Sequence, residues 1–121
     1  MPFINDEGFD QGLDWIDTNG TRLDICTAEP TTYTEATSTN TLGNDTVNTG
    51  ATQDGATDGR RVIVPAITAG SVTGTGTAAD WGLTDGSSVL IATGDLSSSQ
   101  AVTSGNTFTL DAISITIRDA A

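Results

Sequence analysis

The sequence predicts a mainly β protein: an antiparallel β-sandwich or small barrel with one N-terminal α-helix. Threonine and serine together exceed a quarter of the 121 residues, and 14 glycines accompany them. Threonine favours strands, and glycine supplies turns. Short runs of alternating apolar and polar residues follow one another over residues 60–118, which indicates a β-meander. A chain of this length is expected to form a single domain, residues 1–121.

The one stretch with helical spacing lies at residues 5–19. Phe9, Leu13 and Ile16 recur at intervals of four and three residues, so they share one face of a helix. Asn5 or the next residue can cap its start, and Gly20 is the type of residue that commonly follows a helix end. We therefore expect a helix over 5–19 that packs on the β-rich part.

A short strand and a long polar segment follow the helix. Leu23 and Ile25 alternate with polar neighbours, which predicts a strand that ends before Pro30. Residues 31–60 hold few apolar side chains, so we expect a long arm or surface loop there, with room for a short strand near Leu42.

Several residues in the predicted meander indicate strand interruptions or turns. Pro65 interrupts the first strand and suggests an edge or a bulge. Asp85-Gly86 predicts a hairpin turn. The stretch "GDLSSSQ" (94–100) is expected to be another turn, because it separates the apolar run before it from the strand that begins at Ala101.

The last strand, "NTFTLDAISITIRD" (106–119), changes phase in its middle. Phe108 and Leu110 carry the apolar pattern on even numbers, whereas Ile113 and Ile115 carry it on odd numbers. A slip of one residue would turn the apolar set toward solvent. Two structures avoid this outcome: a β-bulge near 111–112, or a strand that leaves one sheet and enters another.

Composition narrows the function classes. The chain has no histidine, one cysteine (Cys26) and four basic residues against 16 acidic ones, for a net charge of −12. Such a charge disfavours binding to nucleic acid or to an anionic membrane surface. No stretch approaches the ~18 apolar residues of a membrane span, and no secretory signal is evident. We expect a soluble protein that is made in the cytoplasm and uses no cofactor or dedicated metal centre, with a weak surface calcium site left open by the number of acidic residues.

Catalytic chemistry is not evident in the sequence. A nucleophilic serine, threonine or cysteine would need a neighbouring base, and neither histidine nor lysine is present. Most aspartates stand beside Gly, Asn or Thr and are interpreted as turn residues. This interpretation covers Asp45, Asp54, Asp58, Asp85 and Asp95. The chain is therefore not expected to be an enzyme.

An acidic stripe on the predicted helix is the strongest candidate for a partner interface. Asp10, Asp14 and Asp17 continue the spacing that starts at Asp6, so the four share one helix face. The simpler interpretation is a solvated face whose first acids suit the positive helix end. The alternative is a contact for a basic partner surface. Trp15 and Trp81 are interpreted as core or subunit-interface aromatics.

Two long segments carry a resemblance to a known group of proteins. They are "GTRLDICTAEPTTYTEAT" (20–37) and "ADWGLTDGSSVLIATGDLSSSQAVTSGNTFTLDAISITI" (79–117). They resemble small structural proteins of tailed bacteriophages and prophages, and the resemblance is weakest over 38–60. It implies a virion component, with a capsid decoration (cement) protein favoured by analogy. The implied partners are the major capsid protein or other virion proteins, and a homo-oligomer, with a trimer favoured.

Three functions are compared. The first is a virion structural protein, with a neck or tail component as a close relative of the decoration role. The second is a fibre-type carbohydrate- or receptor-binding β-module, which predicts an exposed aromatic platform around Trp81 or Tyr33. The third is a hydrolase with two carboxylates about 5–9 Å apart in a pocket, one with a raised pKa.

Overall fold

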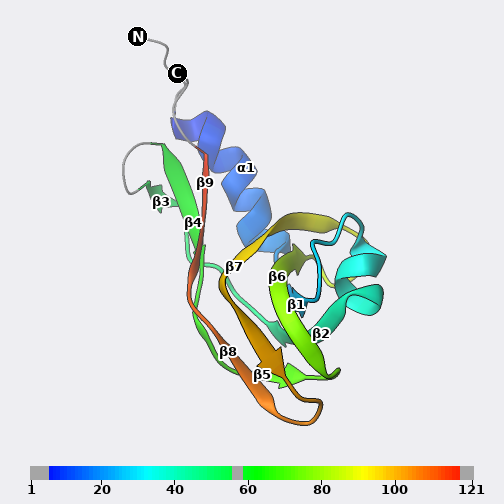
Figure 1. The fold of residues 1–121 in the computed structure, drawn as a ribbon. Coiled ribbons are helices and arrows are strands. Elements are labelled where there is room, and N and C mark those ends of the chain that lie inside the picture. Colours follow the sequence, from blue (N-terminus) through cyan, green and yellow to red (C-terminus); the bar gives the residue numbers. More distant parts are fainter. Residues whose placement is uncertain (1–5, 56–58, 118–121) are drawn as a thin grey trace.

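Two antiparallel sheets and an N-terminal helix make up the molecule (Figure 1). The computed structural model describes residues 6–55 and 59–117, with side chains from residue 11 onward. The prediction of a mainly β, antiparallel fold with one N-terminal α-helix is confirmed. The elements are α1 (Asp6–Asn19), β1 (Arg22–Cys26), a π-helical turn η1 (Glu35–Thr39), β2 (Thr41–Thr46), β3 (Gln53–Asp54), β4 (Arg60–Val64), β5 (Ile67–Val72), β6 (Gly76–Thr84), β7 (Leu90–Val102), β8 (Thr107–Leu110) and β9 (Ile113–Ile117).

The larger sheet is curled and has six strands in the order β7-β6-β1-β2-β5-β8. Strand β1 lies inside it and pairs with β6 and β2. Its Leu23 and Ile25 stand opposite Leu83 and Trp81 of β6, and all four side chains are buried in one core. The apolar side chains predicted for β1 therefore do face the interior.

The phase change in the last strand is a change of sheet. Strand β8 pairs with β5 in the larger sheet, whereas β9 pairs with β4 in the smaller sheet, whose order is β3-β4-β9. The paired segment β4–β5 changes sheet at the same level, because Pro65 and Ala66 separate β4 from β5. Each two-residue crossing carries a strand from one sheet to the other.

The bulge alternative at residues 111–112 is wrong. Val64 pairs with Ile113 on one side of the crossing, and Ile67 pairs with Leu110 on the other. Two residues therefore lie between these pairs on each strand, and neither strand carries an extra residue at the crossing. Both strands change their inward face together, which keeps Val64 and Ile67 buried although they are three residues apart.

The expectation of a long arm at 31–60 is wrong for much of that segment, whereas the strand near Leu42 is present. Strand β2 lies between β1 and β5 in the larger sheet. Its Gly43 is buried, and a Cβ there would come within 2.5 Å of the Ser71 carbonyl oxygen. The polar composition gave only a weak signal for this strand, because a glycine at a close backbone contact adds no apolar side chain.

The predicted turn at 94–100 is a bulge inside one long strand. Strand β7 continues from Leu90 to Val102 along β6. Asp95 pairs with Asp80 and Gln100 pairs with Ala78, so four residues of β7 lie opposite the single Ala79 of β6. The bulge accommodates the serine-rich stretch without ending the strand.

The hairpin turn at Asp85-Gly86 is confirmed. Gly86 has a φ of +78°, and the Asp85 carboxylate accepts the backbone N–H groups of Ser87, Ser88 and Val89 at 2.8–3.0 Å. These bonds lower the pKa of Asp85 below its usual value. Of the other aspartates interpreted as turn residues, Asp45, Asp54 and Asp95 lie in strands, and Asp58 lies outside the described residues.

Helix α1 packs beside the smaller sheet, next to β4 and β9 in Figure 1. Leu13 is fully buried, and Ile16 packs partly against the main core. The helix ends where Gly20 donates its N–H to the Ile16 carbonyl, and a Cβ at Gly20 would lie 2.8 Å from that oxygen. The observed helix Asp6–Asn19 agrees with the prediction over those residues, whereas the predicted cap at Asn5 lies outside the described residues.

Candidate functional site

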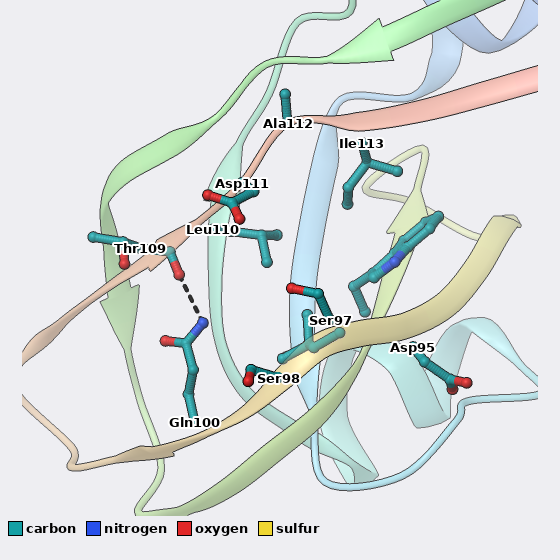
Figure 2. A pocket seen from close by; sticks show the side chains of 11 residues that line it. Asp95, Ser97, Ser98, Gln100, Thr109, Leu110, Asp111, Ala112 and Ile113 are labelled. Atoms are coloured by element: carbon teal, nitrogen blue, oxygen red, sulfur yellow. Dashed lines mark hydrogen bonds between the residues drawn. The ribbon is translucent and has the colours of Figure 1, made fainter.

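A groove of about 530 Å³ lies between the two terminal strands of the larger sheet (Figure 2). Strand β7 contributes one wall, and the crossing from β8 to β9 contributes the other. Because the sheet is curled, its first and last strands come close to each other. The lining residues are Trp81, Asp95, Leu96, Ser97, Ser98, Gln100, Thr109, Leu110, Asp111, Ala112 and Ile113.

The floor of the groove is apolar. Trp81 is 8% exposed, and its indole lies against Gly94 of the adjacent strand, where a Cβ would approach the ring to 2.8 Å. Leu96, Leu110 and Ile113 are partly buried against the same core. Figure 2 shows the last two pointing from the β8–β9 segment into the groove. Glycine at 94 is therefore what allows the indole to lie flat on β7.

Polar groups form the rim. The Gln100 side-chain amide donates to the backbone carbonyl of Thr109 at 2.9 Å and so links β7 to β8 at one end of the groove (Figure 2). Ser97, Ser98 and Asp111 are exposed. The Gln100 side chain thus donates to the Thr109 carbonyl, which in a closed sheet would accept from a backbone N–H of a neighbouring strand.

The opposite face of the sheet holds a pair of carboxyl groups. Asp80 and Asp95 pair directly across β6 and β7, and Figure 2 shows Asp95 pointing away from the groove. A hydrogen bond between the two side chains raises the pKa of Asp80 to about 6, helped by burial and by the charges of Asp95 and Glu29. The two groups share a proton more readily than two isolated carboxylates would.

This pair does not match the hydrolase arrangement. A glycosidase needs its two carboxyl groups about 5–9 Å apart, with the scissile bond or a water between them. Asp80 and Asp95 are hydrogen-bonded to each other, and Asp80 is not among the residues that line the groove. The raised pKa is better explained by two acids held together at a strand pair.

A second buried carboxylate, Asp24, is fully compensated. Its oxygens accept from the Arg22 guanidinium at 2.8 and 3.0 Å and from the Thr41 hydroxyl at 2.7 Å. Cys26 lies on the same face of β1 and is fully buried, and burial together with the nearby Asp24 and Asp80 charges raises the pKa of its thiol to about 12. Asp24 and Cys26 contact Thr41 and the Ala36 carbonyl, which belong to the η1–β2 segment that lies over this face of β1. Because its pKa is raised, the Cys26 thiol stays protonated and is not a reactive thiolate.

The acidic stripe on α1 is only partly a free surface. The Thr49 hydroxyl donates to Asp17 at 2.5 Å, and the Thr52 hydroxyl donates to Asp14 at 3.2 Å. Both aspartates therefore hold the segment that follows β2, although Asp14 remains exposed. The side chain of Asp10 lies outside the described part of the molecule.

The aromatic residues expected to form an exposed binding platform, Trp81 and Tyr33, are not fully exposed. Trp81 is buried and Tyr33 is half-buried, whereas Trp15 on the helix is 49% exposed. The core interpretation is correct for Trp81. Among the described residues, about half of the Trp15 side chain is left uncovered.

The groove was not found from the sequence. Its two walls come from residues 95–100 and 109–113, and only the curl of the sheet brings them together. A local signal existed only for the carboxyl pair on the opposite face: Asp80 stands inside a strand directly before a buried tryptophan, where aspartate is disfavoured.

The described residues offer no metal site and no membrane-spanning helix. Over 6–55 and 59–117, no three histidine, cysteine, aspartate or glutamate side chains are grouped so that they could hold a metal ion. The helices in that part of the chain are too short or too polar to cross a membrane.

Comparison with known proteins gives no match: no protein-family model, curated protein or solved structure is similar to this chain. Function is therefore inferred from the chain's own surfaces.

Proposed function

We propose that this chain is a structural protein of a tailed-bacteriophage virion, and specifically a capsid decoration protein that binds and stabilises the shell. The observation that carries the proposal is an open strand edge. Strands β8 and β9 run in succession from Thr107 to Ile117, and each is the last strand of its sheet among the described residues. An edge of this kind can accept a strand of a neighbouring subunit.

The surface charge supports a partner of opposite sign. A net charge of −12 on 121 residues makes the exterior acidic, and Asp14 on α1 is exposed. Complementary potential would set the register on a basic region of the major capsid protein. Because each contact repeats over the shell, weak individual interfaces suffice.

The proposal includes the virion as location, a homo-oligomer with a trimer favoured, and no enzymatic activity. Threefold positions of a shell suit a trimer, since each subunit then meets an equivalent neighbour. The sequence resemblance of residues 20–37 and 79–117 to phage structural proteins is the reason for expecting this role, and the comparisons with known proteins add no support to it. A neck or tail component would use the same kind of surface.

Co-sedimentation with empty shells of the cognate phage tests the role. The purified protein is expected to bind shells that lack it, and binding is expected to weaken as salt is added. Replacement of Asp10, Asp14 and Asp17 by Asn should lower the shell affinity if the helix face is an interface. Unchanged affinity would remove that face from the proposal, and absence of any shell binding would refute the decoration role.

The carbohydrate-binding alternative gains no support from the aromatic residues proposed for it. A sugar platform needs an exposed ring face, and Trp81 is only 8% exposed. The buried position of that ring favours a structural role for it.

A further inference from the structure

We propose that the groove between β7 and the β8–β9 crossing binds an extended, basic peptide segment of a partner protein as an added strand. The inference uses the same β8 edge as the virion proposal, but it concerns the isolated chain and any partner with such a segment.

The first support is the position of the groove between two sheet edges. Strands β7 and β8 are the terminal strands of the six-stranded sheet, and within the described ranges neither has a strand on its outer side. Unpaired backbone N–H and C=O groups on such edges are templates for another strand. An added strand would extend the curled sheet toward closure.

The second support is the link between Gln100 and the Thr109 carbonyl. That carbonyl belongs to the outer edge of β8, and it accepts from a side chain that comes from β7. The contact shows that the outer side of β8 faces β7 across the groove. A peptide backbone placed there could donate to the same edge, with Gln100 moving aside.

The third support is the distribution of apolar and polar groups. Trp81, Leu96, Leu110 and Ile113 form the floor, and exposed Ser97 and Ser98 lie along one wall. Alternate residues of an extended peptide point to opposite sides. One set of side chains could therefore contact the apolar floor while the other set remains in solvent.

Charge selects the occupant. None of the described residues that line the groove is basic, and the exposed Asp111 borders it, whereas the Asp95 carboxylate points away from the groove. A second copy of this chain would bring its own net charge of −12 to the same place. A partner segment with lysine or arginine is favoured on both counts.

Calorimetric titration of the full chain with three synthetic peptides tests the proposal. The first is acetyl-Val-Arg-Val-Arg-Val-Arg-amide, which spans about 20 Å when extended. The second replaces each Arg by Glu, and the third keeps the Arg residues but carries N-methyl groups on alternate backbone amides. We expect binding of the first peptide, no detectable binding of the second, and at least a tenfold loss for the third, whose strand donors are blocked.

Matched variants locate the contact. Asp111→Asn is expected to weaken binding of the first peptide about two- to fivefold at low salt, as for loss of one exposed ion pair. Asp54→Asn removes the same charge from β3, outside the groove, and should leave the affinity unchanged. Amide shifts in nuclear magnetic resonance spectra should concentrate in residues 95–100 and 109–113.

Several outcomes would overturn the inference. Equal binding of the first and third peptides would mean charge attraction without strand pairing. Shifts confined to the helix face would place the peptide elsewhere, and absence of binding would leave the groove without this ligand. Concentration-dependent self-association that Asp111→Asn abolishes would assign the groove to a second copy. Shell binding measured separately would be unaffected by any of these results.

Discussion

Val64 and Ile113 form the last residue pair of the smaller sheet before both strands cross to the larger one. Their register is the same on the far side of the crossing, where Ile67 meets Leu110. Deletion of Ala112 should therefore shift β9 by one residue and turn Ile113 and Ile115 away from the core. We expect a loss of about 3 kcal/mol in unfolding free energy, measured by urea denaturation.

A compensating deletion provides the control for this register. Removing Ala66 together with Ala112 shortens both crossings equally and keeps Val64 opposite Ile113. The double deletion should be less destabilising than the deletion of Ala112 alone. If the destabilisation of the double deletion equalled the sum of the two single deletions, the equal length of the two crossings would not explain the register.

Asp80 should make stability depend on pH between about 4 and 6. Its pKa is raised from 3.8 to about 6, so the folded state binds more protons than the unfolded state in this window. The stabilisation from the protonated group is present at low pH and is lost as pH rises through 6. Asp80→Asn should therefore raise the unfolding free energy by about 1–2 kcal/mol at pH 7.5 and by much less at pH 4, as followed by thermal or urea denaturation.

A matched variant separates this effect from general charge repulsion. Asp111→Asn removes one negative charge from an exposed position and should change stability by less than about 0.5 kcal/mol. A gain from Asp80→Asn that is equally large at both pH values would contradict the shared-proton explanation.

Asp24 should be far more important to stability than a surface ion-pair partner. It is fully buried and accepts from Arg22 and Thr41, so Asp24→Ala leaves both donors without their acceptor. We expect a loss of about 3 kcal/mol. Asp54→Ala breaks an exposed pair with Arg60 and should cost less than about 1 kcal/mol. Similar urea midpoints for the two variants would refute the distinction.

Gly94 should not tolerate a side chain. A Cβ there would lie 2.8 Å from the Trp81 ring, so Gly94→Ala should displace the indole and destabilise the protein by about 1–3 kcal/mol. A shift in tryptophan emission, recorded with Trp15→Phe in the background, would report the displacement. Gly50→Ala meets no atom within 4 Å and serves as the control.

The sequence predicted the elements that local chemistry determines. The helix over 5–19, the strand at Leu23 and Ile25, and the Asp85-Gly86 hairpin all depend on spacing or turn chemistry within a few residues. The phase change at 111–112 was also visible, and one of its two interpretations was correct.

Elements that depend on distant contacts were predicted only in part or were missed. A strand near Leu42 was expected, but not its place inside the larger sheet. Strand β2 is polar because Gly43 fits a close backbone contact and Thr41 donates to Asp24, and neither reason is local. The serine-rich stretch of β7 has turn composition, yet its pairing with β6 on both sides keeps it extended. The groove combines residues 95–100 with 109–113 through sheet curvature, which no short pattern encodes.

Cys26, the single thiol, gives the molecule a built-in reporter. It is fully buried, and its Sγ contacts the Ala36 carbonyl of the η1 turn at 3.7 Å. An alkylating reagent can reach this sulfur only after the covering turn lifts away. The labelling rate under native conditions would therefore measure how often that part of the structure opens, without any added probe.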